Sequence, residues 1–310
     1  MPRQTEQERA DFDRAIKSVA EQGPLPRAEL DALSMLEGGD LERFREAWAG
    51  LPAGARARLI RALHSAAEQR PRLDFSALNR LALEDADAQV RLAGVQAALE
   101  DRSPALLLKL LELLRSDPSL DVRCAAAEDL ARFTLLGELQ DLEAELTRQV
   151  RQRLLEVARD QSQAPRLRAS ALAALGYFSD METAEELAAG FSNPDLRLGA
   201  VRAMGRTADP RWTDRLMPVL GSDDPQLRQE AARALGEIED ERAVSPLVEL
   251  VDDPAREVRL AVIEALGHIG GEDAREALLY LAEAPEDQIR EAAERALEEI
   301  EETEADPLDL

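Results

Sequence analysis

Four arginines and one tryptophan provide the most distinctive local chemistry in the sequence. Arg202, Arg206, Arg211 and Trp212 lie close together in the chain, and Arg233 follows Arg202 by 31 residues. A guanidinium cluster beside an indole can hold a carboxylate, a phosphate or an acidic side chain through paired hydrogen bonds and stacking. The alternative is structural, with the tryptophan packed between helices and the arginines paired with nearby aspartates.

Histidine and cysteine are too scarce for most catalytic or metal chemistry. His64 and His268 are the two histidines, and Cys124 is the one cysteine. These numbers exclude a four-histidine metal site, an internal disulfide and a four-thiolate zinc site. We expect His268 and Glu264 to form a surface pair, because they are four positions apart on a helix. We also expect Cys124 to be a partly buried small hydrophobe, and we predict no catalytic residue, cofactor or metal.

The elements that position these side chains repeat along the chain. An arginine follows an aliphatic residue and opens an alanine-rich run seven times, at spacings of 32, 45, 29, 31, 31 and 31 residues. A period of about 30 residues is typical of stacked helical units that bury their apolar faces on their neighbours. The repeated arginines are Arg91, Arg123, Arg168, Arg197, Arg228, Arg259 and Arg290.

Each unit carries its own start and stop residues. A proline preceded by Asp, Asn or Ala comes before most of the arginines, as in Asp224-Pro225, and such pairs favour the first turn of a helix. A glycine closes four of the runs, which suggests a left-handed helix end. These glycines are Gly176, Gly205, Gly236 and Gly267. Apolar positions three and four apart, as in residues 243–251, predict a partner helix between runs.

The pattern of Asp-Pro, Val-Arg, an alanine-rich run and Leu-Gly resembles HEAT repeats, in particular the short bacterial variety first associated with phycobilisome lyases. The resemblance covers roughly residues 74–300. It implies an all-α, armadillo-type fold, a right-handed α–α superhelix of about seven to eight helix pairs. Proteins with such repeats include adaptors, chromophore lyase subunits, a di-iron hydroxylase and relatives of DNA glycosylases, so function must be argued from sites.

The resemblance also implies that the helix opened by each arginine lines the concave side. Positions one and five after the arginine then face a groove. They are Leu92 and Gln96, Cys124 and Glu128, Ala169 and Ala173, Leu198 and Arg202, Gln229 and Arg233, Leu260 and Glu264, and Glu291 and Arg295. We predict a partner-binding site made of Leu198, Arg202, Arg206, Arg211, Trp212 and Arg233. The repeated arginines are assigned to structure, paired with turn acids such as Asp117, Asp223 and Asp252.

The repeat also defines the domain organisation. Residues 1–50 are expected to form a helical cap at the N-terminal end, and residues 51–300 the solenoid. The interval of 45 residues indicates a helical insertion near residues 134–160, which either extends or adds a helix. Residues 301–310 are predicted to be an acidic, disordered tail.

Charge is distributed unevenly. The net charge is −25, and residues 237–310 contain 24 acidic and 6 basic side chains. Phosphate binding requires compensating cations, so nucleic acid and anionic membranes are excluded as partners. No run approaches the roughly 20 apolar residues of a membrane span. We therefore expect a soluble, cytoplasmic, bacterial protein.

The function favoured by the sequence is that of a non-catalytic scaffold or adaptor. Its partner is a protein or peptide held in the concave groove, and a monomer is favoured. The alternative is a lyase-like or hydroxylase-like enzyme or enzyme subunit, which the scarcity of histidine disfavours. A glycosylase relative would need a basic channel, whereas the sequence pI is about 4.5.

Overall fold

Helices account for all the regular structure of the described residues. The computed structural model describes residues 6–21, 23, 25–98 and 101–305, and within these ranges it contains no strand. No helix in the described chain is both long and apolar enough to cross a bilayer. The chain divides into an N-terminal unit, Met1–Leu130, and a C-terminal unit, Ala131–Leu310, with the division inside one helix.

The N-terminal unit is built on one continuous core. Its helices are α1 (Glu6–Ala20), α2 (Arg27–Ala32), α3 (Gly38–Ala49), α4 (Ala53–Gln69), α5 (Ser76–Leu83), α6 (Ala88–Ala97), α7 (Pro104–Ser116) and the start of α8 (Leu120–Glu138). Buried apolar residues from Phe12 to Ala93 form a single cluster. The predicted boundary at residues 50 and 51 therefore falls within a shared core. Residues 1–5, 22 and 24 of the predicted cap lie outside the described residues.

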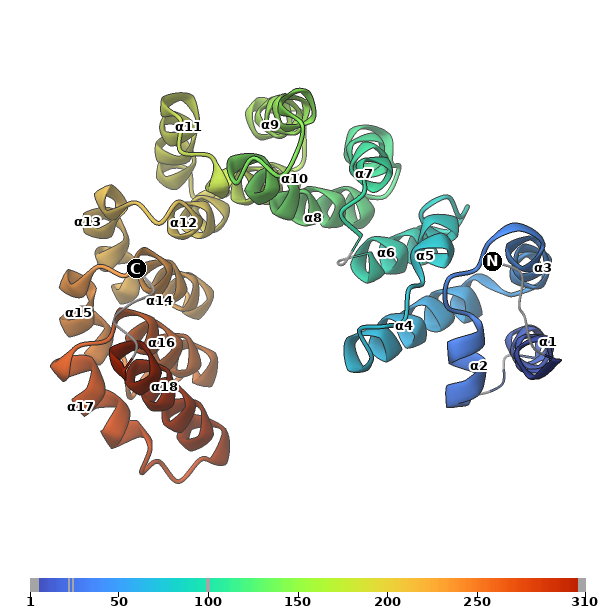
Figure 1. Cartoon of the computed structure of the whole chain (residues 1–310). Coiled ribbons are helices and arrows are strands. Elements are labelled where there is room, and N and C mark those ends of the chain that lie inside the picture. Colours follow the sequence, from blue (N-terminus) through green and yellow to red (C-terminus); the bar gives the residue numbers. More distant parts are fainter. Residues whose placement is uncertain (1–5, 22, 24, 99–100, 306–310) are drawn as a thin grey trace. The chain divides into compact units, whose positions relative to one another are not determined.

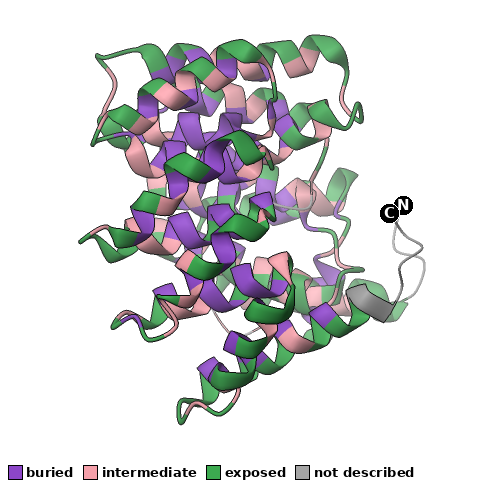
Figure 2. Cartoon of the chain, turned by 90° about the vertical axis from the view of Figure 1, so that its left-hand side faces the viewer, coloured by how far each residue is buried: buried purple, intermediate pink, exposed green. Residues whose placement is uncertain are grey.

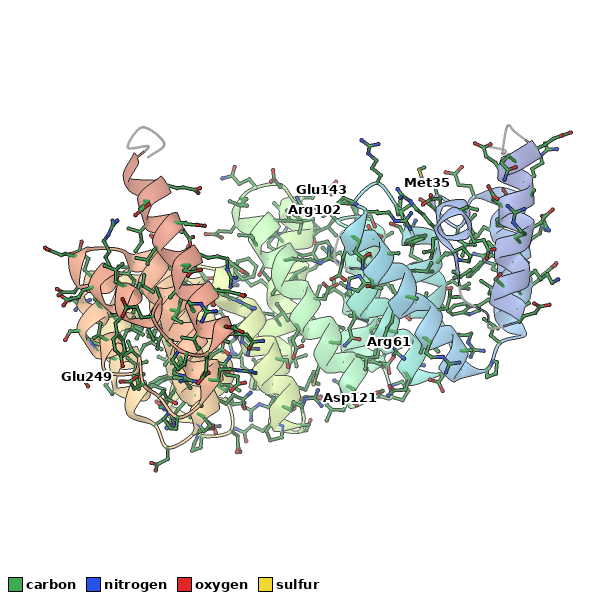
Figure 3. All side chains as sticks on the ribbon, turned by 90° about the horizontal axis from the view of Figure 1, so that it is seen from below. Met35, Arg61, Arg102, Asp121, Glu143 and Glu249 are labelled. Carbon is green, nitrogen blue, oxygen red and sulfur yellow. The ribbon has the colours of Figure 1, made fainter. Side chains whose placement is uncertain are left out.

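Two polar links fasten the first three helices to the repeats. Trp48 Nε1 donates to Asp85 Oδ2 at 3.2 Å, and Arg56 Nη2 donates to Asp85 Oδ1 at 2.8 Å. The N–H of Met35 donates to the Asp74 carbonyl at 2.7 Å, although the Met35 side chain is 68% exposed and projects from the surface (Figure 3). These bonds bind the cap to the turns on either side of α5.

The C-terminal unit consists of two layers of helices (Figure 1). The first helix of each pair lies in one layer: α9 (Ala144–Arg159), α11 (Met181–Ser192), α13 (Thr213–Leu216), α15 (Val244–Val248) and α17 (Glu272–Leu281). The second helix lies in the other: α10 (Pro165–Ala174), α12 (Arg197–Arg206), α14 (Pro225–Ile238), α16 (Arg256–Ile269) and α18 (Asp287–Ala305). Short 3₁₀ segments join them: η1 (Leu175–Tyr177), η2 (Pro210–Trp212), η3 (Met217–Gly221) and η4 (Glu241–Ala243). Buried residues line the helix sides that face one another (Figure 2).

The acids that precede proline start the second helices. Asp224 Oδ1 accepts the N–H of Gln226 at 2.9 Å, and Asp253 Oδ1 accepts the N–H of Ala255 at 2.8 Å. The Asp224 bond satisfies a main-chain N–H group that the first turn of α14 leaves open, whereas the Asp253 bond orders the turn just before α16. The proline then fixes the backbone angle that the turn needs.

The prediction that glycines end their helices was wrong for three of the four. Gly176 does follow the end of α10, within η1, but without a positive φ. Gly205, Gly236 and Gly267 lie inside α12, α14 and α16, and none has a positive φ. Their role is close packing between second helices. A Cβ at Gly236 would lie 2.7 Å from Ala265 Cα, and one at Gly205 would lie 2.6 Å from Ala234 Cα. Backbone atoms cannot yield at such distances, so glycine sets the spacing of the layer.

The expected insertion lengthens existing helices instead of adding one. The α8 helix continues to Glu138 and α9 begins at Ala144, so the residues near 134–160 are absorbed into α8, a short turn and α9. The predicted disordered tail was partly wrong, because α18 includes residues 301–305. Residues 306–310 lie outside the described part of the chain.

Candidate binding face of the C-terminal unit

The repeated arginines hold adjacent units together. Arg91 donates from Nε and Nη2 to the two carboxylate oxygens of Asp117, at 2.7 and 2.8 Å. Arg228 makes the same paired bonds with Asp253, at 2.8 and 2.9 Å. Asp253 takes the place that we expected for Asp223 or Asp252. One aspartate therefore orders the turn before a second helix and also binds the arginine of the preceding unit.

The buried aspartates of these pairs remain ionised. Burial alone would raise the pKa of Asp117, but the bonds from Arg91 and from the N–H of Ser119 lower it below its ordinary value. The pKa of Asp253 is lowered in the same way, against its burial, by Arg228 and the N–H of Ala255. Paired hydrogen bonds to a guanidinium are strong enough to outweigh the loss of hydration.

The other repeated arginines use different acceptors. Three donate to a main-chain carbonyl at 2.9 Å: Arg123 to Leu114, Arg168 to Ala158 and Arg197 to Phe191. Arg259 Nη2 donates to Glu286 Oε2 at 2.8 Å, and Arg290 pairs with Asp287. All seven arginines thus bond to a turn or to the end of a helix.

An open face lies on the second-helix layer of the C-terminal unit. It is formed by positions five and nine after each of the last four repeated arginines, all of which keep exposed or half-exposed side chains. These residues, here called the open face, are Arg202, Arg206, Arg233, Glu237, Glu264, His268, Arg295 and Glu299. Two positions expected in the groove are instead buried, because Cys124 is 1% and Ala173 3% exposed.

Two of the predicted site arginines are already engaged. Arg202 donates from Nε and Nη2 to the carboxylate of Glu230, each at 2.8 Å, and the Glu230 side chain is only 9% exposed. Arg206 donates from Nη1 to the Ala173 carbonyl at 2.9 Å and lies 5.5 Å from the centre of the Tyr177 ring. Leu198 is half-buried on the same helix as both arginines.

Pairs further along the open face are looser. Arg233 Nε lies 3.9 Å from Glu264 Oε2, and the two side chains are 46% and 57% exposed. His268 Nε2 lies 3.9 Å from Glu299 Oε1, so His268 faces the next unit and not Glu264, which we had expected. At 3.9 Å neither contact is a hydrogen bond, and an exposed ion pair such as Arg233–Glu264 contributes about 0–1 kcal/mol.

Arg211 and Trp212 do not join this face. They belong to η2, which leads into the first-helix layer at α13. Trp212 is 4% exposed, with the Arg211 and Arg215 guanidinium groups each 5.5 Å from its ring centre, and Arg211 bonds to Asp209. Burial removes Trp212 from the surface that we expected a partner to touch. The predicted set therefore separates into two groups.

Glu237 is a member of the open face that the sequence argument missed. The pKa of Glu237 is raised because neighbouring helices remove part of the hydration of its carboxylate, although the residue stays exposed. Arg206 opposes this shift, while Glu230 and Glu264 add to it. The signal was present, since Glu237 lies four residues after Arg233 on α14. Glu237 is position nine after Arg228, one helical turn beyond position five, the last position that the sequence analysis assigned to the groove.

Metal ligands are not grouped in the described chain. His64 Nε2 lies 3.5 Å from Glu68 Oε1 within α4, and His268 lies on α16. Among the described residues, no three side chains of His, Cys, Asp or Glu come together as a set of ligands.

The family comparison supports the repeat assignment over part of the chain. Residues 213–298, which run from α13 into α18, match the family model for HEAT repeats. These residues are HEAT repeats. They include Arg233, Glu237, Glu264, His268 and Arg295, so five of the eight residues of the open face lie within the matched HEAT segment. No curated protein matches the sequence.

Several solved structures are similar to the chain. The phycocyanin lyase complex of CpcE and CpcF from Nostoc is 16% identical, covers 80% of this chain and 90% of its own, and has a TM-score of 0.49. The YibA protein of Escherichia coli is 17% identical, covers 96% and 99%, and has a TM-score of 0.43. Human deoxyhypusine hydroxylase is 21% identical, covers 96% and 97%, and has a TM-score of 0.34. At these TM-scores the likenesses say nothing about a shared activity.

Proposed function

We propose that the protein is a non-catalytic scaffold that holds a segment of a partner protein against the open face of its C-terminal unit. The observation that carries this proposal is a contrast between the two sides of the second helices. Their packed side repeats the same glycine and alanine contacts from unit to unit. Their open side changes at each unit, from Arg206 to Glu237 to His268 to Glu299 at position nine. Variable side chains on a constant scaffold are suited to recognition.

Within the proposed binding site, the most suitable residues are those whose present contacts a bound segment could replace. Arg233 and Glu264 are exposed and lack a direct hydrogen bond to each other, so a bound segment could replace their contact at small cost. Leu198, half-buried beside Arg202, offers apolar contact. Arg202 and Arg206 contribute mainly through their charge, because their donors already serve Glu230 and Ala173. Arg211 and Trp212 are withdrawn from the proposal.

A charge reversal with a matched control tests the site. Arg233→Glu changes an exposed residue of the open face, and Arg256→Glu makes the same change at an exposed residue that begins α16 and pairs only with Glu257 among the contacts described. Surface changes of this kind alter stability by about 0.5 kcal/mol or less, so thermal unfolding should remain close to that of the parent protein. Each variant would be cross-linked in cells of the native organism, and captured partners identified by mass spectrometry.

We expect Arg233→Glu to lose the partner and Arg256→Glu to retain it. Equal recovery with both variants would rule out the open face as the site. The enzyme-subunit alternative is tested on the same purified protein, by its absorption spectrum and iron content. A bound chromophore or stoichiometric iron would overturn the non-catalytic assignment.

A further inference from the structure

Charge changes from basic to acidic along the last four helices of the second-helix layer of the C-terminal unit, α12 to α18. The α12 helix contains three arginines and no acid, so its net charge is +3. The α14 and α16 helices each contain two arginines and two glutamates and are neutral by these charges. The α18 helix contains eight acids and two arginines, for a net charge of −6. The layer therefore runs from a basic end at α12 to an acidic end at α18.

Over the same four units, the first-helix layer has no such gradient. The α11 helix contains three glutamates and no base, α13 one acid and one arginine, α15 no charge, and α17 three acids and one arginine. Net charges of −3, 0, 0 and −2 follow in that order. The gradient thus belongs to the layer that carries the open face, and the overall acidity of the chain does not account for it.

Contacts at the basic end leave positive charge in place. Arg197 and Arg206 donate to the carbonyl groups of Phe191 and Ala173, which accept hydrogen bonds without cancelling charge. The carboxylate of Glu230 offsets Arg202. At the other end, Glu299 is 57% exposed. Arg295 lies on the same face, but the exposed Glu291 and Glu298, four residues before it and three after it on α18, keep this end acidic. Both ends can therefore attract opposite charge on a bound chain.

We infer that the partner segment is an extended, bipolar polypeptide, with acidic residues at the end that lies over α12 and basic residues at the end that lies over α18. This inference rests on the proposed function, because it specifies what the open face binds. Packed helices lie about 8–10 Å apart, so three steps from α12 to α18 span about 25–30 Å. An extended chain rises about 3.3 Å per residue, so about eight residues separate the two charged ends of the segment.

Charge complementarity favours this occupant over a segment of one sign. A uniformly acidic segment would meet the carboxylates of α18, and a uniformly basic one would meet the arginines of α12. Like charges placed together across an interface disfavour binding. The gradient also fixes direction, because reversing the segment would place like charges together at both ends.

Labelled peptides test the inference on the full chain. The block peptide has aspartates at one end, lysines at the other and about eight uncharged residues between them. A second peptide has the same composition with alternating charges, and two more carry only aspartate or only lysine as charged residues. Binding is measured by fluorescence anisotropy at physiological ionic strength. We expect the block peptide to bind at least about 10-fold more tightly than the other three.

Variants at each end supply the matched controls. Glu299→Gln and Arg206→Gln remove one charge from the acidic and basic ends, and each should weaken block-peptide binding about 5-fold or more. Glu276→Gln removes an exposed carboxylate from α17 in the other layer and should leave it unchanged. If Glu299→Gln and Glu276→Gln weaken block-peptide binding equally, the peptide is attracted by the overall negative charge of the chain and not by the acidic end of the open face. That result would overturn the inference.

A photo-cross-linker at each end of the block peptide tests direction without altering the protein. The aspartate end should label α12 and the lysine end α18. Labelling in the opposite order, or tight binding by the alternating peptide, would contradict the inference. If no peptide binds while Arg233→Glu still loses its cellular partner, the bipolar inference fails and the scaffold proposal stands. If Arg233→Glu keeps its partner, the scaffold proposal fails whatever the peptides do.

Discussion

The packed and open sides of the second helices in the C-terminal unit follow different rules. On the packed side, Gly205, Gly236 and Gly267 approach Ala234, Ala265 and Ala296 of the next helix in the same register each time. On the open side, the residue at position nine changes from arginine to glutamate to histidine to glutamate. The repeated side sets the spacing of the helices, and the varied side carries whatever distinguishes one unit from the next.

This difference explains why the repeated arginines are poor binding residues. Arg228 is 13% exposed and serves Asp253 and a turn carbonyl, whereas Arg233 is 46% exposed and holds Glu264 only loosely. The two arginines lie on the same helix and differ in nothing but their surroundings. The arginine that recurs in every unit, such as Arg228, holds the units together. An arginine at a position that varies between units, such as Arg233, lies on the open face.

The largest effect should come from breaking a buried arginine pair. Arg228→Ala leaves the Asp253 carboxylate, 3% exposed, without its guanidinium, and removal of one partner from a buried pair costs about 3–5 kcal/mol. Urea denaturation monitored by circular dichroism measures the loss. A loss similar to that of Arg233→Ala, which we expect to be within about 0.5 kcal/mol of the parent, would erase the distinction between the two arginines.

The Arg228–Asp253 pair also determines how the stability of the protein should depend on pH. The pKa of Asp253 is lower in the folded chain than its ordinary value, so its ionised form is the stabilising one. That contribution is complete above the ordinary pKa of an aspartate and is lost as the pH falls through the lowered value. The stability difference between Arg228→Ala and the parent protein should therefore shrink below about pH 4. A difference that stays constant down to acid unfolding would contradict the ion pair.

The sequence was sufficient to predict the repeat but not the role of every residue in it. The aliphatic-arginine spacing predicted an all-helical solenoid, and that fold is confirmed. The roles of Gly236 and Trp212 were mistaken for physical reasons. A glycine required by a neighbouring backbone looks the same in sequence as a glycine that ends a helix. An indole beside two arginines looks the same whether the ring is open or, as here, 4% exposed.

The sequence also does not distinguish a charged residue with a buried partner from one with an exposed partner. Arg202 and Arg233 hold the same position in adjacent units, yet Arg202 meets the buried Glu230 while Arg233 meets the exposed Glu264. The difference depends on which residue the next helix presents, two positions or five positions after its own repeated arginine. The partner of an arginine on the open face therefore depends on how adjacent units pack, and it cannot be predicted from the sequence of one unit.

An intermediate effect should follow from filling a close contact on the packed side. Gly236→Ala gains up to about 1 kcal/mol of helix propensity, but its Cβ would lie 2.7 Å from Ala265 Cα. Overpacking against a backbone atom typically costs about 1–3 kcal/mol, so we expect net destabilisation in thermal or urea unfolding. Gly54→Ala in α4 is the control, because its Cβ would meet only the flexible end of Arg58, 3.7 Å away. That control should be neutral or stabilising, and destabilisation of both would show that the effect is not one of packing.

The smallest effect should come from the open face, at Glu237. Because the pKa of Glu237 is raised in the folded chain, its charged form is disfavoured there, and stability is lost as the pH rises through the raised value. Glu237→Gln removes that cost, and screening at an exposed position limits the gain to about 0.5 kcal/mol near neutral pH. The gain should vanish below the ordinary pKa of glutamate, where the parent residue is already protonated. Urea unfolding of Glu237→Gln and the parent protein at pH 4 and pH 7 measures the difference in stability where the gain should be absent and where it should be complete. A loss of stability at pH 7 would mean that the carboxylate stabilises the layer, as the packed-side residues do, and the division between the two sides would fail at this position.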